Sequence, residues 1–206
     1  MARVSQEHLD ARRRQILDGA ARCFARNGFH ATSMQDVFTE VGLSAGAVYR
    51  YFNGKEALIA AIAQEAFGGI RAAFEDASRM VPPPMPDVLL GGVLRMFLEQ
   101  RIPGADQRAF PRLIIQVWTE TLRDEQLSAT LAAGYQGMRA AWSELVEAYR
   151  KNGLLRADVP ADHVARTLIA VAQGFIAQQA LFGDVAVEVL EDGLRGLMSM
   201  ETQSAS

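Results

Sequence analysis

The sequence predicts an all-helical protein of about nine helices. Its apolar residues recur three and four positions apart, which is the spacing of an amphipathic helix, whereas the two-residue alternation typical of strands is nearly absent. Glycine, proline and Asn-Gly breakers fall at well-separated points and leave segments long enough for helices between them. We expect a small N-terminal domain over residues 1–54 and a larger C-terminal helical domain over residues 55–206, linked by a helix over residues 55–80.

Composition and charge narrow the class of protein. The chain has 206 residues, half of them apolar, which is enough for one sizeable core or for a small module joined to a larger one. The net charge is −3 but is unevenly distributed, because residues 1–60 carry eight Lys or Arg and six Asp or Glu, whereas the remainder carries 13 and 18. Any contact with nucleic acid must therefore come from a local patch and not from the whole surface.

We expect a cytoplasmic protein. The single cysteine, Cys23, cannot form an internal disulfide, and no basic-apolar signal peptide precedes the first predicted helix. No apolar run reaches the ~20 residues that cross a bilayer. Because Cys23 lies beside an apolar helical stripe and has no apparent activating partner, we interpret it as a small core residue.

The first predicted helix covers about residues 8–27, where apolar residues form one stripe, and it ends at Asn27-Gly28, a pair suited to a left-handed turn. The chain continues with two short helices. Thr32 or Ser33 caps the first of them, and Gln35 or Asp36 is placed to complete a capping box.

A sharp turn at Gly42 separates the two short helices. Ser44 caps the second one, which runs to about Tyr51 and is stopped by Asn53-Gly54. The segment therefore has the order helix, glycine-containing turn, helix.

The fourth predicted helix, over residues 55–80, has apolar residues stepping by four, four, three, four and three. It would span roughly 35–40 Å at 1.5 Å per residue. The prolines within residues 82–86 end it. A helix of this length is suited to act as a rigid lever between the two domains.

The remaining predicted helices are mostly amphipathic and cover about residues 87–101, 105–122, 125–151, 161–182 and 185–200. The helix that begins at residue 161 is apolar around most of its circumference, so it must be covered on two sides. This pattern favours a homodimer formed by an intermolecular four-helix bundle. The alternative is that one chain's own core covers both faces. The predicted dimer contacts are Leu168, Ala172, Ile176, Phe182, Leu190, Leu194 and Leu197.

The short-helix segment carries the main functional prediction. In a helix-turn-helix, the second helix enters the major groove and presents residues near its N-terminus to base edges. The small residues of Ser44-Ala45-Gly46 permit close approach, and Tyr49 and Arg50 are long enough to reach bases or phosphates. The helix starts at Thr32-Ser33 and at Lys55 offer free backbone N–H groups to phosphates.

These residues resemble the DNA-binding signature of the TetR (tetracycline-repressor) family over about Ile16 to Leu58. The matching residues are Gly28-Phe29, Thr32-Ser33-Met34, Val37, Val41-Gly42-Leu43-Ser44, Gly46, Val48-Tyr49, Tyr51-Phe52, Lys55-Glu56 and Leu58. The resemblance implies a repressor that forms a dimer through its last two helices. It also implies that the C-terminal domain binds a small-molecule inducer, which causes the repressor to release DNA.

The resemblance also implies roles for individual residues. Thr32 and Ser33 fall where the family caps its second helix near phosphate, and Ser44, Ala45 and Gly46 begin its recognition helix. Tyr49 and Tyr51 match DNA-contact positions, and Lys55 matches the phosphate-binding lysine.

Two departures concern the detail of the interface. Phe38 stands where the family usually places a small residue, at a point where the two short helices approach closely. The larger side chain is expected to affect how these helices pack. Ala45 and Ala47 leave few hydrogen-bonding side chains on the recognition helix, so base readout is expected to depend on Tyr49, Arg50, Ser44 and Gln35. The tyrosines have an ordinary alternative as half-buried packing residues, and Arg50 has one as a solvated surface charge. Arg12, Arg13 and Arg14 either face solvent on the first helix or approach the DNA backbone from the start of that helix.

A pocket for the inducer is predicted from residue types in the C-terminal domain. Such pockets are mostly apolar with a few polar groups, and the set predicts a hydrophobic or aromatic inducer, although each member alone is better explained as core. The predicted pocket residues are Phe97, Phe110, Trp118, Tyr135, Met138, Trp142, Gln173, Phe175 and Gln178. Glu120 would suit a cationic ligand if it faced inward, so the charge of the ligand stays open.

Two other functions compete with the repressor. An enzyme is disfavoured because His8, His30 and His163 lack metal-ligand spacing and no glycine-rich phosphate loop follows a strand. We therefore expect no cofactor, no metal site and no catalytic residue. The second rival is a DNA-binding protein that acts architecturally or through a protein partner, without an inducer.

Overall fold

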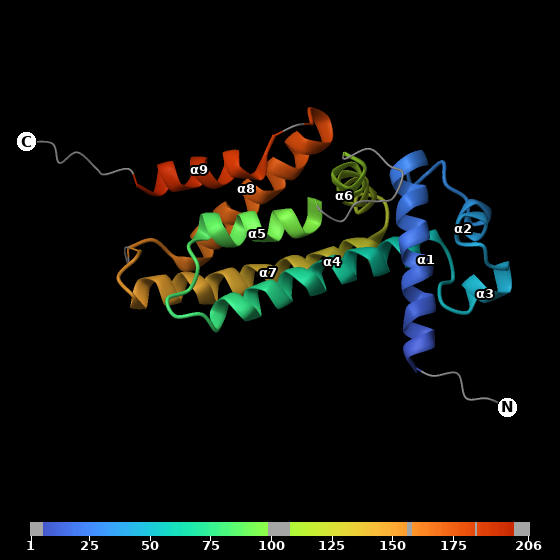
Figure 1. Ribbon diagram of the computed structural model, residues 1–206, viewed down its shortest axis with the longest axis horizontal. Coiled ribbons are helices and arrows are strands. Elements are labelled where there is room, and N and C mark those ends of the chain that lie inside the picture. Colours follow the sequence, from blue (N-terminus) through green and yellow to red (C-terminus); the bar gives the residue numbers. More distant parts are fainter. Residues whose placement is uncertain (1–5, 99–107, 156–157, 184, 200–206) are drawn as a thin grey trace, which may run out of the picture. The chain divides into compact units, whose positions relative to one another are not determined.

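The computed structural model describes residues 6–98, 108–155, 158–183 and 185–199, and within these ranges the protein is all-helical (Figure 1). The prediction of an all-helical fold is confirmed. The described helices are α1 (Gln6–Asn27), α2 (Met34–Val41), α3 (Ala45–Tyr49), α4 (Lys55–Ser78), α5 (Pro86–Leu98), α6 (Ala109–Glu120), α7 (Glu125–Lys151), α8 (Ala161–Leu181) and α9 (Val187–Met198).

Contacts divide the chain into two compact units. Unit 1 comprises Met1–Gly68 and Gln100–Gly134, and unit 2 comprises Gly69–Glu99 and Tyr135–Ser206. The boundary predicted between residues 54 and 55 stays a prediction. The sequence assigned α6 to the C-terminal domain, whereas its contacts place it with α1 in unit 1.

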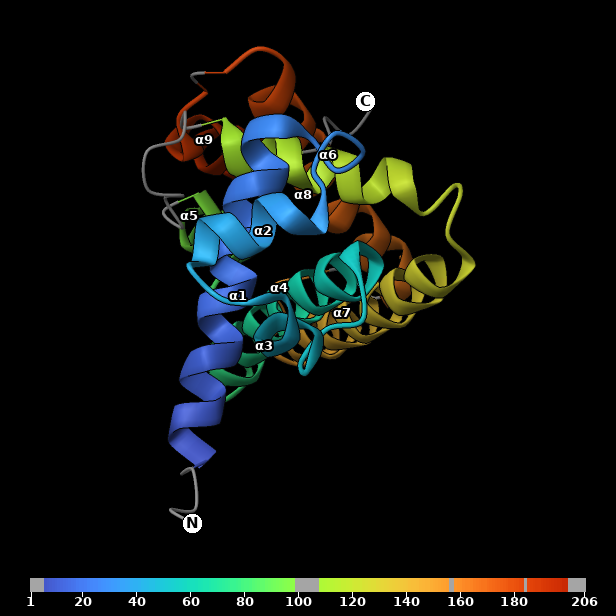
Figure 2. The ribbon, with the colours of Figure 1, turned by 90° about the vertical axis from the view of Figure 1, so that its right-hand side faces the viewer.

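Unit 1 is organised around α1, which packs against α2 (Figure 2) and against α6. At Gly19 the backbone of α1 lies so close to α2 that an added Cβ would stand 2.2 Å from Val41 Cγ1. Cys23 is fully buried in this core and burial raises the pKa of its thiol, in keeping with a packing role. The largest fully buried side chains of this core are Phe24, Ile16, Leu17, Leu58, Ile59, Leu113, Leu127 and Val37.

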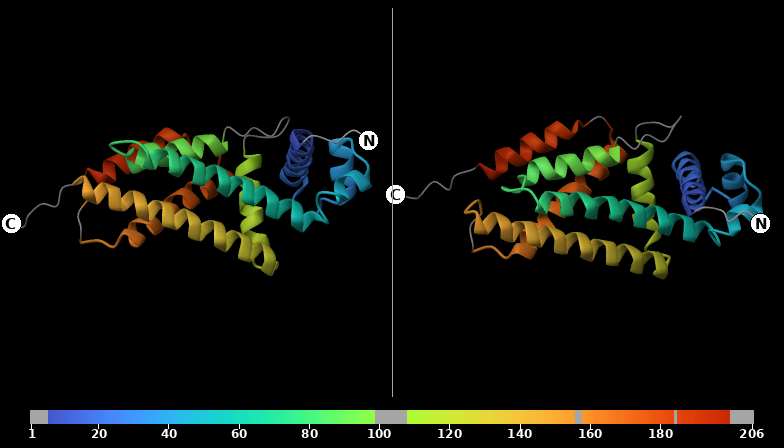
Figure 3. Two further views of the ribbon diagram at one scale, coloured as in Figure 1. Left: turned by 90° about the horizontal axis from the view of Figure 1, so that it is seen from below. Right: turned by 60° about the horizontal axis from the view of Figure 1, so that its bottom comes forward.

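Unit 2 is organised around α5, which lies beside α9 and also contacts α8 (Figure 3). Its core contains an aromatic pair in which Phe74 and Trp142 meet edge to face, with ring centroids 4.7 Å apart. Pro86 is the first residue of α5, a position where its missing N–H costs no helical hydrogen bond.

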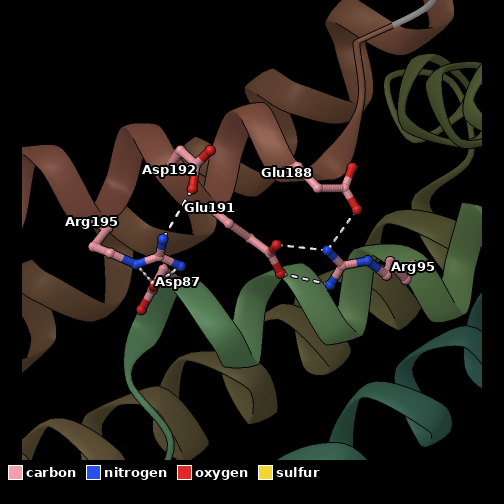
Figure 4. Close-up of polar contacts among 6 residues, drawn as sticks. All are labelled: Asp87, Arg95, Glu188, Glu191, Asp192 and Arg195. Atoms are coloured by element: carbon pink, nitrogen blue, oxygen red, sulfur yellow. Dashed lines mark hydrogen bonds and ion pairs between the residues drawn. The ribbon is translucent and has the colours of Figure 1, made fainter.

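A cluster of charged residues joins α5 to α9 (Figure 4). The Arg95 guanidinium donates two hydrogen bonds of 2.6 Å to Glu191 and one of 2.9 Å to Glu188. Arg195 of α9 pairs with the buried Asp87 of α5 at 3.1 Å. Two-pronged pairs of this kind fix orientation as well as distance, so the cluster sets the register of α9 along α5.

Helix α4 is long and apolar enough to cross a membrane when judged by length and composition alone. Part of its apolar surface is buried in packing, however. Leu58 and Ile59 are buried in the core of unit 1, and Phe74 and Ala77 are buried in unit 2.

Candidate nucleic-acid interface

Helix α2 begins with a capping box formed by Ser33 and Asp36. Ser33 Oγ accepts a hydrogen bond from the Asp36 N–H at 3.2 Å, and the Asp36 carboxylate accepts one from the Ser33 N–H at 2.7 Å. The Ser33 hydroxyl also donates to the Asp36 carboxylate at 2.7 Å, and this bond, together with the one from the Ser33 N–H, holds the pKa of Asp36 below its usual value. Of the alternatives left open by the sequence, Ser33 and Asp36 therefore form the cap.

Thr32 lies inside unit 1 and not on its surface. Its side chain is only 1% exposed, and its hydroxyl lies 2.7 Å from the Gly28 carbonyl and 3.2 Å from that of Cys23. The hydroxyl closes the C-terminal end of α1. Its predicted place near phosphate is corrected accordingly, because this side chain is not available to DNA in the structure, whereas the neighbouring Ser33 is exposed.

The turn between α2 and α3 has the geometry that the sequence predicts. Gly42 adopts φ 65° and ψ 33°, in the left-handed region where a side chain would be strained. The Leu43 N–H then donates to the Phe38 carbonyl at 3.1 Å, which terminates α2. Ser44 caps α3 by accepting a hydrogen bond from the Ala47 N–H at 3.3 Å.

Helix α3 is shorter than predicted. It ends at Tyr49, and Arg50 and Tyr51 lie in the following turn. Its exposed surface is made of small residues, and a Cβ added at Gly46 would meet nothing within 4 Å. The exposed residues from Ser33 to Arg50 include the predicted contacts Ser33, Gln35, Ser44, Ala45, Gly46, Tyr49 and Arg50.

The two tyrosines differ in environment. Tyr49 is 46% exposed, and its ring meets the buried ring of Phe38 edge to face, with centroids 5.4 Å apart and planes at 71°. Tyr51 is half-buried and packs against the core of unit 1. The alternative of a half-buried packing tyrosine therefore fits Tyr51 better than Tyr49.

Lys55 ties the start of α4 to the connection between α1 and α2. Its ammonium donates to the Phe29 carbonyl at 2.9 Å and to the His30 carbonyl at 3.4 Å, and it lies 4.8 Å from the centroid of the Phe29 ring. The ammonium has three N–H donors, so these two bonds leave one for a phosphate.

A carboxylate clamp fastens α2 to α1. Glu40 accepts hydrogen bonds from Arg22 at 2.7 Å and from Arg26 at 3.0 Å, and these bonds hold the pKa of its carboxyl below the usual value. The clamp lies beside the close approach at Gly19, so charge and packing restrain the same pair of helices.

Helix α6 contacts the same connection through Gln116, which the sequence did not indicate, and through Glu120, which the sequence suggested only for a cationic ligand. Gln116 Oε1 accepts a hydrogen bond from the Phe29 N–H at 2.9 Å. His30 Nε2 lies 3.1 Å from the buried carboxylate of Glu120 and 3.0 Å from Arg123 Nη1. The spacing of four between Gln116 and Glu120, which places both side chains on one face of α6, was the available signal.

The predicted pocket residues fall into both units. Phe110 and Trp118 belong to unit 1, and the members from Tyr135 onward belong to unit 2. Trp142 is a core residue that packs on Phe74, Phe175 is buried, and Gln178 is exposed. The side chain of Phe97 lies outside the described residues. Tyr135, Met138, Gln173 and Trp118 are half-buried.

The predicted dimer residues divide into three groups by burial. Leu168 and Leu194 are buried within unit 2, as the alternative of a self-covered core requires. Phe182 and Leu197 are 76% and 68% exposed. Ala172, Ile176 and Leu190 are half-buried, and two exposed neighbours, Leu181 and Val189, extend the apolar surface.

Among the residues that the structure describes, no group of three or more His, Cys, Asp or Glu side chains is placed to hold a metal ion. The described geometry around α3 consists of a capped helix, a left-handed glycine turn and an exposed short helix. These are the parts of a helix-turn-helix.

Comparison with known proteins agrees with this geometry. Residues 16–62 match the model for bacterial regulatory proteins of the tetR family, and residues 92–199 match that for the C-terminal part of BetI-type transcriptional repressors. The transcriptional repressor AcnR of Corynebacterium diphtheriae is 30% identical over 93% of this chain and 96% of its own length. The repressor Rv1474c of Mycobacterium tuberculosis is 29% identical over 87% and 88%.

Solved structures give the same assignment. Salmonella enterica GusR superposes with a TM-score of 0.74 at 26% identity and covers 97% of this chain and 100% of its own. Several of these relatives are named as transcription regulators, and the resemblance drawn from the residues between Ile16 and Leu58 is confirmed. The chain therefore belongs to the TetR family of bacterial regulatory proteins, which bind DNA to control transcription.

Proposed function

We propose that this protein represses transcription by binding a palindromic operator as a homodimer, and that a small hydrophobic or aromatic inducer releases it. The observation that carries the proposal is the exposed surface of α3, where small residues precede Tyr49 on a capped helix-turn-helix. A major groove admits such a helix because nothing bulky projects before the residues that reach the bases.

The residues of this surface divide into two roles. Ala45 and Gly46 permit close approach, and Ser44, Tyr49 and Arg50 reach base edges, with Gln35 beside them on α2. Ser33, Tyr51 and Lys55 contact the phosphate backbone and set the register. Phosphate contacts contribute affinity that falls with salt, whereas the base contacts contribute sequence preference.

The exposed apolar surface of α8 and α9 supports the homodimer. Leu181, Phe182, Val189 and Leu197 are each more than half exposed in the isolated chain. Leu181 and Phe182 lie at the end of α8, and Val189 and Leu197 lie along α9. Large exposed apolar side chains on the last two helices are typical of a surface that a partner covers. A second copy provides a matching surface and places two α3 helices at major grooves one turn apart, about 34–36 Å.

The inducer acts through α6 in this proposal. Gln116 and Glu120 connect α6 to Phe29 and His30, directly before the cap of α2. A ligand that favours a shifted α6 would pull on this connection and move α2 and α3 out of register with the operator. The long helix α4 remains the second connection, as the sequence suggested.

The DNA-binding part is tested by selecting bound sequences from random DNA with the full-length protein. We expect a short palindrome with half-sites about 10 base pairs apart. Recovery of no preferred sequence, with binding that follows only salt concentration, would overturn the proposal.

The inducer is tested by titrating hydrophobic and aromatic molecules into the complex with that palindrome. Fatty acyl-CoA belongs in the panel because FadR from Bacillus subtilis, whose crystal structure contains stearoyl-CoA, shares this fold at 15% identity and a TM-score of 0.70. We expect one class to release the DNA, and a Gln116→Ala variant to need more of it. Release by none of the panel would favour control by a protein partner.

A further inference from the structure

Phe38 connects the core of unit 1 to Tyr49, the aromatic residue of α3. It lies in the last turn of α2 and is 8% exposed, and its ring meets the Tyr49 ring edge to face at 5.4 Å. Tyr49 is the final residue of α3, and nearly half of its surface faces solvent. The tyrosine ring thus packs against a buried side chain while part of it remains exposed to solvent.

Phe38 is itself held firmly. Its ring belongs to the apolar core of unit 1, and its carbonyl accepts hydrogen bonds from the N–H groups of Gly42 and Leu43 at the end of α2. Helix α3 has only five residues, too few for a helix to be rigid by its own hydrogen bonds. The direction of Tyr49 therefore depends on what the ring packs against.

We propose that Phe38 is a positioning residue that fixes the direction in which Tyr49 presents its phenol to the operator. The inference rests on the proposed function, in which Tyr49 contacts DNA. Phe38 lies in the core and takes no part in the contact itself. It acts by removing rotamer freedom from Tyr49 before binding, so that this entropy is not lost on the DNA.

The same contact limits which bases Tyr49 reaches. A phenol held from one side sweeps a narrow range of positions, whereas a free phenol adapts to several base pairs. Phe38 thereby contributes to sequence preference at the base pair that Tyr49 contacts, although Phe38 is shielded from the DNA.

The test is a double-mutant cycle on the selected palindrome with Phe38→Leu, Tyr49→Ala and the double variant. Leucine keeps an apolar side chain in the core but removes the aromatic edge. We expect Phe38→Leu to weaken specific binding about 2- to 12-fold when Tyr49 is present, the range for one immobilised side chain. In the Tyr49→Ala background the same change should have an effect of less than about 2-fold.

Phe24→Leu is the matched control, because Phe24 is fully buried in the same core and its ring contacts Phe29 and not Tyr49. It should change binding by the same factor in both backgrounds. Thermal unfolding without DNA identifies variants that lose the fold. Where Phe38→Leu does so, Phe38→Met repeats the cycle with a more adaptable apolar side chain.

The outcomes are separable. An equal effect of the Phe38 change in both backgrounds, or no effect in either, overturns the positioning role. A flattened base preference in Phe38→Leu at the same base pair as in Tyr49→Ala supports it, and a preference altered elsewhere contradicts it. If Tyr49→Ala alone leaves specific binding unchanged, it is the proposed DNA contact of Tyr49 that fails.

Discussion

The exposed surfaces of α3 and of α8 and α9 are opposite in character. Helix α3 presents small residues and a single aromatic ring, whereas α8 and α9 present Phe182, Leu197 and other large apolar side chains. A groove lined by polar base edges and phosphates requires little bulk and few, well-placed contacts. A second copy of the chain instead requires an apolar surface that excludes water. The exposure of a residue therefore indicates function only together with its chemistry.

The two regions also differ in how they are held together. The helix-turn-helix is fixed by a close glycine approach, a capping box and the Glu40 clamp. Helix α9 is fixed on α5 by the Arg95 and Arg195 charge pairs.

Leu197→Glu should dissociate the dimer and weaken operator binding more than about 100-fold, because an unpaired charge buried at an interface costs several kcal/mol. The fold of the single chain should survive, since this side chain is 68% exposed there. Sedimentation velocity measures the mass. Leu122→Glu is the control, because Leu122 is 84% exposed but belongs to unit 1. A dimer that persists in Leu197→Glu would show that this surface has another use.

Gly19→Ala should lower the free energy of unfolding by about 1–3 kcal/mol, because its Cβ would overlap Val41 and force α2 away from α1. Gly46→Ala is the matched change on α3. It meets open space and should stabilise the helix by up to about 1 kcal/mol, yet it should weaken operator binding by adding bulk at the groove. Chemical denaturation and DNA titration measure the two quantities. Tight operator binding by Gly46→Ala would argue against close approach of α3.

Glu40→Gln should destabilise the protein at neutral pH but not in acid. Because Arg22 and Arg26 lower the folded-state pKa of Glu40, its contribution is present above its unfolded pKa of about 4.5 and is lost as the pH falls through the lower folded value. Denaturation of both proteins from pH 7 to pH 3 should show the difference between them closing. Asp18→Asn, an exposed carboxylate on the same helix α1, is the control. A difference that is constant with pH would contradict the clamp.

Tyr149→Phe should have the smallest effect, about 0.5–1.5 kcal/mol, through loss of the hydrogen bond that its hydroxyl donates to the Pro84 carbonyl at 2.5 Å. Burial, with the nearby charge of Asp87, raises the pKa of Tyr149 to about 12. The stability contributed by the protonated Tyr149 phenol is therefore fully present below pH 10 and is lost as the pH rises through about 12. The variant should lose less stability than the parent over that interval, as measured by alkaline denaturation. An equal loss in both proteins would be inconsistent with a buried phenol.

The sequence predicted the features that depend on neighbouring residues. The Ser33 and Ser44 caps, the turn at Gly42 and the bounds of α7 follow from local chemistry, and the structure agrees with them. The resemblance places Thr32 near phosphate together with Ser33, whereas in the structure the end of α1 takes up the Thr32 hydroxyl.

The contacts that sequence reasoning missed join distant parts of the chain. Gln116 and Phe29 lie 87 positions apart, so no local pattern connects them. Leu168 and Leu194 show a related limit, because helical periodicity marks an apolar face but does not say whether the same chain or a second copy covers it. Only the burial seen in the structure distinguishes the exposed Phe182 and Leu197 from Leu168 and Leu194.

The most direct test of the central claim is the ratio of affinities for the selected palindrome and for scrambled DNA, measured at one salt concentration for the parent protein and for Tyr49→Ala. We predict that the ratio falls about 5- to 150-fold, the effect of losing one specific base contact, while binding to scrambled DNA is nearly unchanged. An unchanged ratio, or an equal loss on both DNAs, would contradict the claim that α3 reads the operator through Tyr49.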